Sequence, residues 1–420
     1  MAGLHNMNDT SAARFNPRLS EFRADPYPTY RYLRTHQPIY YRAEQKDWVL
    51  TRYADIVEVL KSPDFGRSES RWAPSVTGTN GGPINRLLSI RHESNNLMGL
   101  WLVLTNPPDH TRIRRLLLRA FTQSRITALQ ASIQVQVDSY IDQAVERGKL
   151  EVIGDLAYPL MLDLNCREIL GIPHQNWHRN FKQWTESMSL VADMDITPIA
   201  YERGMLAISG LAEFFRNRIA GCRAGCEPAD NLIGMLIEEA GQLSEEELLA
   251  NCIMMFTVGH SSTVNLIGIS VLTLLKHPGQ LQLLVEDPSL IETAISEVLR
   301  YDSPVQGVAR TALCDVELAN TKIHRGEKVI CIIGAANRDP AQFPEPDTFD
   351  IRRRPNPHLS LGYGIHTCIG KHLSQLVARI VVGTLIRRLP GLSLATDATD
   401  SLEWEDSFLG HGLKALPIVF

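Results

Sequence analysis

Apolar residues recur at helical spacing through most of the chain, and only short stretches have the composition of strands. The longest helical pattern, residues 244–276, begins with a Ser-x-x-Glu capping box and stops before a His-Pro pair. Residues 38–42 and 47–51 are rich in Tyr, Ile, Trp and Val, which is typical of strands. The pattern therefore predicts a mainly α protein with small β-sheets.

Shorter patterns fill most of the remaining chain. They predict a helix opened by residues 25–30, helices at residues 53–61 and 111–119, several helices within residues 126–236, and a long helix that starts near residue 369. Residues 67–98 lose this periodicity and are rich in Ser, Asn, Gly and Pro. We expect a long loop there, and loops of that length in compact domains are usually functional or mobile.

Length and composition indicate one large globular unit. The chain has 420 residues, 44% of them hydrophobic and 21% charged, and no linker interrupts it. We therefore expect a flexible polar leader, residues 1–24, and a single domain, residues 25–420. The net charge is −5, so no global basic field favours nucleic acid. The first residues have neither a basic region nor an apolar run, which predicts a cytoplasmic protein without a membrane anchor.

Two further features of composition narrow the kind of site. The 244–276 helix is apolar nearly all round, as a membrane span would be, but polar residues gather in its middle, which favours a buried site. The seven cysteines are an odd number and are scattered, so they predict no disulfide framework. Cys222 and Cys226 are the only close pair, and without a second pair they do not predict a zinc site.

The richest chemistry lies in residues 360–370, where three glycines and one cysteine precede a helical pattern. Cys368 is expected at a helix N-terminus, where a lowered pKa would make its thiolate a nucleophile or a metal ligand. The glycines leave room for a flat, bulky group to approach the loop. Taken alone, a free cysteine is more often a small buried apolar residue than a nucleophile or a metal ligand. The sequence upstream of the loop is needed to distinguish these roles.

This loop resembles the heme-binding loop of the cytochrome P450 family, whose signature is Phe-Gly-x-Gly-x-His-x-Cys-x-Gly. The resemblance implies heme b (iron protoporphyrin IX) as cofactor, with Cys368 as axial ligand of the iron. The surrounding loop positions that it implies for cofactor binding are Leu361, Gly362, Gly364 and Gly370. Leu361 stands where the family usually has phenylalanine, which implies a changed heme potential or loop rigidity.

Two other sets of residues extend the resemblance. Glu297 and Arg300 match the family's Glu-x-x-Arg motif about seventy residues before the cysteine, and Arg353 resembles the third member of that buried network. The residues that resemble the family's partners of the heme propionates are His110, Arg114, Arg310 and His366. Arg112 and Arg115, on the same predicted helix, are then expected to point toward an electron donor or water.

The middle of the 244–276 helix resembles the family's Ala/Gly-Gly-x-Asp/Glu-Thr-Thr segment, which crosses the oxygen side of the heme. This implies catalytic roles for Gly259, Ser261, Ser262 and Thr263. Ser261 replaces the usual carboxylate, and Ser262 keeps a hydroxyl where the family has threonine. Three outcomes stay open: hydroxylation with protons routed through Ser262, Thr263 and water; oxidative coupling, cyclisation or desaturation without oxygen insertion; or a neutral replacement.

The resemblance also implies a substrate pocket and partners. Pocket residues by position are Val258, Val305, Gln306, Val308, Phe408 and Leu409. The implied protein is a soluble, monomeric bacterial-type monooxygenase that uses O2, with electrons from a ferredoxin or flavodoxin and its NAD(P)H-dependent reductase. By resemblance to the family's soluble members, its substrate would be a small, largely apolar or aromatic secondary metabolite. Residues 101–110 are also similar to those of members that couple aryl groups of indole alkaloids. Alternatives are peroxide-driven oxidation and a heme sensor or carrier without turnover.

Overall fold

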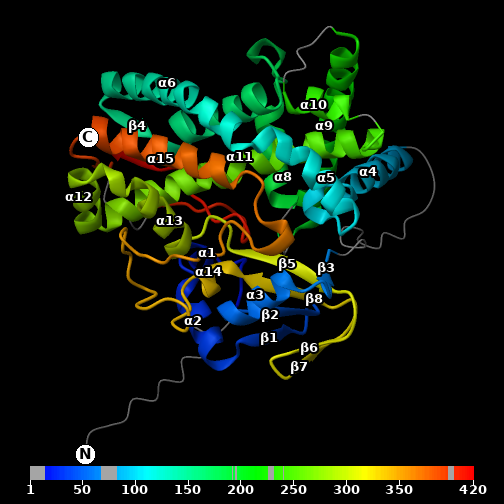
Figure 1. Ribbon diagram of the computed structural model, residues 1–420, viewed down its shortest axis with the longest axis horizontal. Coiled ribbons are helices and arrows are strands. Elements are labelled where there is room, and N and C mark those ends of the chain that lie inside the picture. Colours follow the sequence, from blue (N-terminus) through cyan, green and yellow to red (C-terminus); the bar gives the residue numbers. More distant parts are fainter. Residues whose placement is uncertain are drawn as a thin grey trace, which may run out of the picture.

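The computed structural model describes residues 15–67, 83–191, 193, 196–225, 231–239, 241–395 and 402–420. It has a large helical part and a smaller part built around a sheet, which lies below the helices in Figure 1. The predicted fold class, mainly helical with small sheets, is confirmed.

The helices follow one another along most of the chain. They are α1 (Ser20–Ala24), α2 (Tyr27–His36), α3 (Tyr53–Lys61), α4 (Pro83–Gly99), α5 (Asp109–Leu117), α6 (Gln123–Arg147), α7 (Tyr158–Asp163), α8 (Phe181–Val191), α9 (Pro198–Arg223), α10 (Leu232–Glu238), α11 (Glu245–Lys276), α12 (Pro278–Glu286), α13 (Ile291–Tyr301), α14 (Ile333–Ala336) and α15 (Lys371–Arg388). Helices predicted at residues 53–61 and after residue 369 are thus confirmed. So are the helix predicted at residues 111–119, in its greater part, and the several helices predicted within residues 126–236.

The strands form three small sheets. They are β1 (Ile39–Arg42), β2 (Asp47–Leu50), β3 (Phe65–Gly66), β4 (Lys149–Glu151), β5 (Gly307–Ala312), β6 (Val316–Leu318), β7 (Thr321–Ile323), β8 (Lys328–Ile332), β9 (Ser393–Leu394) and β10 (Pro417–Val419). The largest sheet has the order β1-β2-β8-β5-β3, with β2 parallel to β8 and β5 antiparallel to it. Its register pairs Arg310 of β5 with Val329 of β8, and so fixes one predicted cofactor residue on a rigid strand.

Helix α11 is the central core element. Ser244 caps its N-terminus, because the Ser244 hydroxyl accepts a hydrogen bond from the Glu247 N–H while the Glu247 carboxylate accepts one from the Ser244 N–H. The helix packs against α4, α7, α9 and α15, and runs through the middle of the helical part in Figure 1. Its most apolar window is long enough for a membrane span, but 72% of that window is buried inside the protein. Tertiary packing therefore accounts for its apolar character.

One predicted loop is partly a helix. Residues 67–98 were expected to lack regular structure, but residues 83–99 form α4, while residues 68–82 lie outside the described part. Leu97 and Met98 are buried, and the Ser94 hydroxyl donates to the Met205 carbonyl of α9 at 3.0 Å. Packing against α9 thus stabilises a helix that its own weak periodicity did not predict.

The described end of the predicted leader, residues 15–24, packs against the domain. Phe15 and Phe22 are buried, and the Phe15 ring lies 5.4 Å from the rings of both Phe22 and Phe408, centroid to centroid. Residues 1–14 lie outside the described part. The packed structure therefore begins before residue 25, because two aromatic side chains upstream of it cover the turn that contains Phe408.

Replacing Phe15 with alanine should lower the free energy of unfolding by about 3 kcal/mol, since it removes a buried aromatic side chain. Equilibrium unfolding in urea measures the change. Leu19→Ala is the matched control, because Leu19 is 43% exposed in the same segment and should change stability by less than about 0.5 kcal/mol. Equal effects of the two variants would contradict the packed arrangement of residues 15–24.

Candidate active site

Two glycines set the path of the loop that carries Cys368. Gly362 and Gly364 have φ of 77° and 69°, a region that residues with side chains rarely adopt. A Cβ at Gly362 would lie 2.9 Å from the His366 carbonyl oxygen, and one at Gly364 would lie 2.6 Å from that of Leu60. The Cys368 N–H closes the loop by donating to the Leu361 carbonyl at 2.7 Å. The loop thus holds the cysteine three residues before α15 begins.

Gly370 differs from the other two glycines. Its φ is −89°, and a Cβ there would meet only the edge of the Phe121 ring, at 4.0 Å. The protein atoms themselves therefore do not require glycine at this position. A glycine here leaves room for a separate group close to the backbone, as the resemblance implies.

The electrostatics of Cys368 correct one prediction. Its side chain reaches an accessible face, but surrounding protein atoms desolvate the sulfur and raise the pKa of the thiol. The Gly370 N–H and the charges of Arg114 and Lys371 lower that pKa, and their sum is smaller than the effect of desolvation. The expected lowering by the helix N-terminus was therefore wrong for the free thiol. A metal cation bound to the sulfur would remove its proton.

A cluster of basic side chains lies beside this loop, and we call it the cationic cradle: Arg67, His110, Arg114, Arg310 and His366. The rings of the two histidines are 4.2 Å apart, centroid to centroid. Arg114 donates to the Thr367 carbonyl at 2.6 Å, and Arg67 and Arg310 both donate to the Ala309 carbonyl, at 2.7 and 2.9 Å. The structure thus brings together the four residues predicted to face the propionates.

The cradle is built to receive negative charge. Burial and the neighbouring arginines lower the pKa of His110 to about 4 and that of His366 to about 2. The neighbouring charges that lower these two pKa values are cationic, and both ring nitrogens of His110 are buried without a hydrogen-bond partner. Guanidinium and imidazole donors in this arrangement suit a bound dicarboxylate.

Arg67 is the cradle member that sequence reasoning missed. It follows β3 directly, and its own N–H donates to Asn106 Oδ1 at 2.8 Å while its carbonyl accepts from Asn106 Nδ2 at 2.8 Å. These paired bonds fix the backbone next to α5. Only the sheet topology places β3 beside β5 and therefore Arg67 near Arg310, so no signal along the chain could have identified it.

A buried ionic network supports the site from α13. Arg300 donates from Nε and Nη2 to the two carboxylate oxygens of Glu297, both at 2.8 Å, and both side chains are fully buried. Arg353 adds a bond to Glu297 at 3.0 Å, which confirms the predicted grouping of these three residues. Asn356, which was not predicted, donates to the same carboxylate at 3.1 Å. The remaining guanidinium N–H groups bind backbone carbonyls, so the network fixes the chain from residue 337 to residue 353.

A second, neutral network joins α13 to the cysteine loop directly, and sequence reasoning missed it. Asn337 donates to the hydroxyls of Ser303 and Ser360, at 2.8 and 2.7 Å, and accepts from the Leu359 N–H at 2.8 Å. The Ser360 hydroxyl also donates to the Leu299 carbonyl. Because Asn337 is fully buried, these bonds hold the start of the loop in one position.

The middle of α11 presents a small accessible face. Val258 is 45% exposed, and Gly259, Ser261 and Ser262 are half-buried, although the helix on either side is buried. Val258, Ser261 and Ser262 share one face because they are three and four residues apart. Thr263, predicted to act beside them, is buried instead. The face carries hydroxyls and apolar surface but no ionisable side chain.

The predicted pocket residues divide into two groups. Val305, Val308 and Leu409 are half-buried. Phe408 belongs to the aromatic cluster with Phe15, and the Gln306 side chain is 1% exposed. Gln306 donates to the Ser303 carbonyl at 2.8 Å and accepts from the Tyr30 hydroxyl at 3.0 Å.

Gln306 was expected to offer a polar contact to substrate, and the structure places it differently. Its amide is engaged at both ends within the buried core, so it supports the turn at residues 408–409. The Gln306 N–H also donates to the Leu409 carbonyl at 3.1 Å. An alternating strand pattern cannot distinguish a residue that faces a cavity from one that faces a neighbouring helix, which explains the error.

The two other arginines of α5 were expected to point toward an electron donor or water, and Arg115 is exposed to water whereas Arg112 is half-buried. Arg112 bonds both Asp109 and Glu247, with nearest distances of 2.7 and 2.6 Å. Arg115 donates to the Gln242 side chain at 2.8 Å. Both side chains therefore tie α5 to the beginning of α11.

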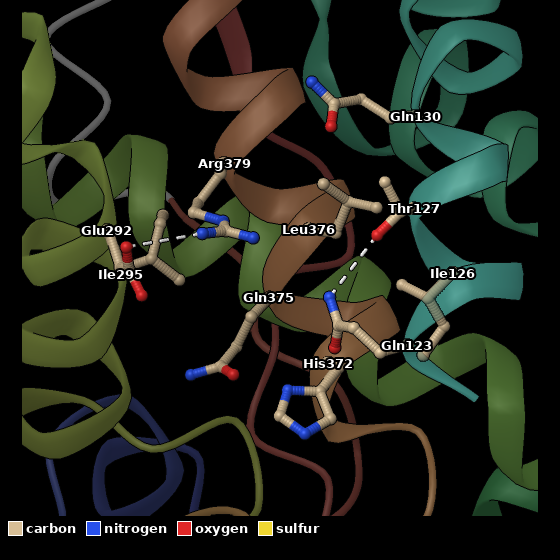
Figure 2. Close-up of a pocket in the computed structure, with 10 residues that line it drawn as sticks. All are labelled: Gln123, Ile126, Thr127, Gln130, Glu292, Ile295, His372, Gln375, Leu376 and Arg379. Atoms are coloured by element: carbon tan, nitrogen blue, oxygen red, sulfur yellow. Dashed lines mark hydrogen bonds and ion pairs between the residues drawn. The ribbon is translucent and has the colours of Figure 1, made fainter. Parts of the chain in front are cut away.

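A polar groove of about 230 Å³ lies between α6, α13 and α15 (Figure 2). Arg379 faces Glu292 across it at 3.6 Å, and Gln123 donates to the Thr127 hydroxyl at 3.4 Å. None of the residues predicted for catalysis, cofactor or substrate lines this groove.

The residues described contain no group of three or more His, Cys, Asp and Glu side chains arranged to hold a metal ion.

The fold and the cysteine loop match a known class of protein. Residues 284–412 match the family model described as Cytochrome P450. The "Biotin biosynthesis cytochrome P450" of Bacillus subtilis (strain 168) is 37% identical over 96% of this chain and 98% of its own length. The "Polyketide biosynthesis cytochrome P450 PksS" of the same organism is 31% identical over 96% and 98%.

The solved structures agree with this assignment. The crystal structure of "P450BioI in complex with hexadec-9Z-enoic acid ligated Acyl Carrier Protein" matches with a TM-score of 0.87 and 35% identity, covering 96% of this chain and 99% of that one. The chain therefore belongs to the cytochrome P450 family, and its cofactor is heme. The residues present fit that group, because the accessible Cys368 sulfur lies beside a cradle of basic side chains in which both buried ring nitrogens of His110 are without a hydrogen-bond partner.

Glu297→Gln should lower the free energy of unfolding by about 3 kcal/mol or more, because it leaves Arg300 buried without its charge partner. Urea unfolding measures the loss. Glu292→Gln is the matched control on the same helix, since Glu292 is 78% exposed and exposed ion pairs contribute at most about 1 kcal/mol. A Glu297 variant as stable as the control would show that the network does not support the fold.

Proposed function

We propose that this cytochrome P450 monooxygenase inserts one oxygen atom of O2 into a neutral, largely apolar metabolite of natural-product biosynthesis. The accessible face of α11 carries the proposal. It consists of Val258, Gly259, Ser261 and Ser262, and its only polar side chains are uncharged hydroxyls. A charged substrate group next to this face would lose hydration without gaining a partner.

The relatives support the same class of substrate. One is named for biotin biosynthesis and one for polyketide biosynthesis, and a solved relative carries a fatty acid on an acyl carrier protein. The fatty acid in the last of these, hexadec-9Z-enoic acid, is a long and mainly apolar carbon chain. We infer that this chain accepts a substrate of similar character, and indole- or phenol-derived metabolites stay within the class to be tested.

The chain's own residues would hold the cofactor from two sides. The Cys368 thiolate would bind the iron, and the cationic cradle would bind the two propionates through Arg67, Arg114, Arg310 and the two histidines. When bound, heme supplies the redox centre at which O2 is activated and, with a thiolate ligand, O–O cleavage is favoured. Gly362, Gly364 and Leu361 keep the loop closed under the sulfur.

Proton supply would depend on Ser262. Hydroxylation consumes two electrons and two protons: RH + O2 + 2e⁻ + 2H⁺ gives ROH + H2O. Ser261 cannot ionise, so the Ser262 hydroxyl and water would pass the protons at the α11 face. Thr263 is buried away from that face and would act on the helix rather than on the substrate.

We also propose the setting in which the enzyme works. Electrons would come from a ferredoxin or flavodoxin and its NAD(P)H-dependent reductase, since family members of this bacterial type use separate redox partners. A cytoplasmic, monomeric protein that does not bind nucleic acid or membrane agrees with the acidic net charge of −5 and the buried α11. Membership of an enzyme family favours turnover over a heme sensor or carrier.

The serine at position 261 favours a second candidate reaction. Coupling, cyclisation or desaturation removes two hydrogen atoms without inserting oxygen: RH2 + O2 + 2e⁻ + 2H⁺ gives R + 2H2O. Both reactions use the same electrons and protons, so the fate of the oxygen atom separates them. Peroxide-driven oxidation would proceed without an electron donor.

The function is tested on the purified holoprotein with a reductase and ferredoxin. Compounds from four classes, namely fatty acids, macrolactones, indoles and phenols, are screened for a shift of the Soret band, and those that bind are incubated under ¹⁸O2. One labelled oxygen atom in the product confirms monooxygenation, and unlabelled coupled or desaturated product supports the second candidate. Cys368→Ala should abolish the red-shifted ferrous carbonyl band. Persistence of that band, or binding without any product, would refute the proposal.

Arg67→Gln should raise the rate of heme loss about tenfold, because a charged hydrogen bond contributes about 1.5 kcal/mol or more. Transfer of heme to an apoglobin, followed by absorbance, measures the rate. Arg52→Gln is the control, since Arg52 is exposed and lies outside the cradle. Identical rates for the two variants would exclude Arg67 from cofactor binding.

A further inference from the structure

Four consecutive carbonyls of α11 accept side-chain hydrogen bonds. The Thr257 hydroxyl donates to the carbonyls of Ile253 and Met254, at 2.9 and 3.0 Å. Asn165 donates from Nδ2 to the next two, those of Met255 and Phe256, at 3.2 and 2.9 Å. A helix interior normally reserves these carbonyls for backbone N–H groups four residues later. This turn of α11 therefore carries competing donors on each of its carbonyls.

Asn165 reaches this turn from a different part of the chain. It lies in a short π-helical segment (Leu164–Ile169) that follows α7, and its residue surface is 3% exposed. Its Oδ1 lies 3.2 Å from the position that a Cβ on Gly259 would occupy. The absence of a side chain at Gly259 therefore leaves room for the Asn165 amide against α11.

The competition acts on the residues of the accessible face. The carbonyls of Met255 and Phe256 are the acceptors that the N–H groups of Gly259 and His260 use in a regular helix. A side-chain donor that shares these carbonyls competes with the helical N–H groups for them. Within the buried run from Leu248 to Leu274, the accessible positions are residues 258, 259, 261 and 262. The carbonyls that Asn165 shares are thus the acceptors for residues at the accessible face.

We propose that Asn165 is a positioning residue for the reaction. Its amide holds the turn of α11 at Gly259 and His260 open, and this places the Ser262 hydroxyl and a neighbouring water for proton transfer. The inference rests on the role proposed above for Ser262. Residue 261 is a serine and provides no carboxylate to bind that water. The position of the water therefore depends more on the backbone geometry of this turn than it would with a carboxylate at residue 261.

The alternative role for Asn165 is ordinary packing, and the two roles predict opposite changes in amide hydrogen exchange. In Asn165→Leu, the carbonyls of Met255 and Phe256 lose the side-chain donor and accept hydrogen bonds from the N–H groups of Gly259 and His260 alone. The proposal therefore predicts that these amides of the holoenzyme exchange more slowly, roughly threefold or more, given the usual strength of one hydrogen bond. A packing residue would, on removal, loosen the helix and speed exchange. Unchanged or faster exchange overturns the proposal.

Two further variants keep the test decisive. Asn165→Ala removes the same donor without adding bulk and should slow exchange at the same amides, so the test stands even if the leucine variant does not fold. Ser270→Ala is the matched control, because the Ser270 hydroxyl makes a comparable bond to the Leu266 carbonyl, at 2.6 Å, farther along the same helix. It should leave exchange at residues 259–262 unchanged.

Turnover provides the second readout. With a substrate identified as above, the Asn165 variants should deliver a smaller fraction of NAD(P)H electrons to product and a larger fraction to hydrogen peroxide, while Ser270→Ala should match the unaltered enzyme. An unaltered split between product and peroxide overturns the proposal even if exchange slows. Failure of the unaltered enzyme to form product would instead refute the proposed function, and the exchange result would still stand.

Discussion

The buried pair of Glu297 and Arg300 is the interaction on which the arrangement of the site depends. Both charged side chains are fully buried, so each is stabilised by the other. The guanidinium N–H groups of Arg300 that do not bind Glu297 are satisfied by backbone carbonyls. Those carbonyls belong to residues 337, 346 and 348, and Arg353 adds further ones. The irregular segment before the cysteine has little regular structure of its own, and this network fixes its path. Neighbouring Asn337 then carries the constraint to Ser360.

Much of this organisation could be predicted from the chain. The capping box and the His-Pro stop defined α11 to within one residue, and a glycine-bounded cysteine before a helical pattern located the loop. The Glu-x-x-Arg spacing identified a pair whose geometry the structure confirms. These features are local, because each depends on residues within one or two turns of one another.

The features that sequence reasoning missed depend on tertiary contacts. Helix α4 forms on the surface of α9, Arg67 reaches the cradle through the pairing of β3 with β5, and Gln306 faces Tyr30 rather than a cavity. The thiol of Cys368 has a raised pKa because surrounding protein atoms desolvate the sulfur, an effect that spacing along the chain does not report. Local sequence patterns thus identified the segments that form the site. Tertiary packing determines which of their side chains face the site and how their pKa values shift.

The main-chain closure of the cysteine loop has a consequence for position 361. The two left-handed glycines and the bond from the Cys368 N–H to the Leu361 carbonyl involve no side chain at residue 361. These backbone bonds can form with either leucine or an aromatic ring there, although the Leu361 side chain also packs against the main core. This separation makes the residue a point at which the electronic surroundings of the sulfur can be retuned by engineering, with the ligand-bearing scaffold left intact.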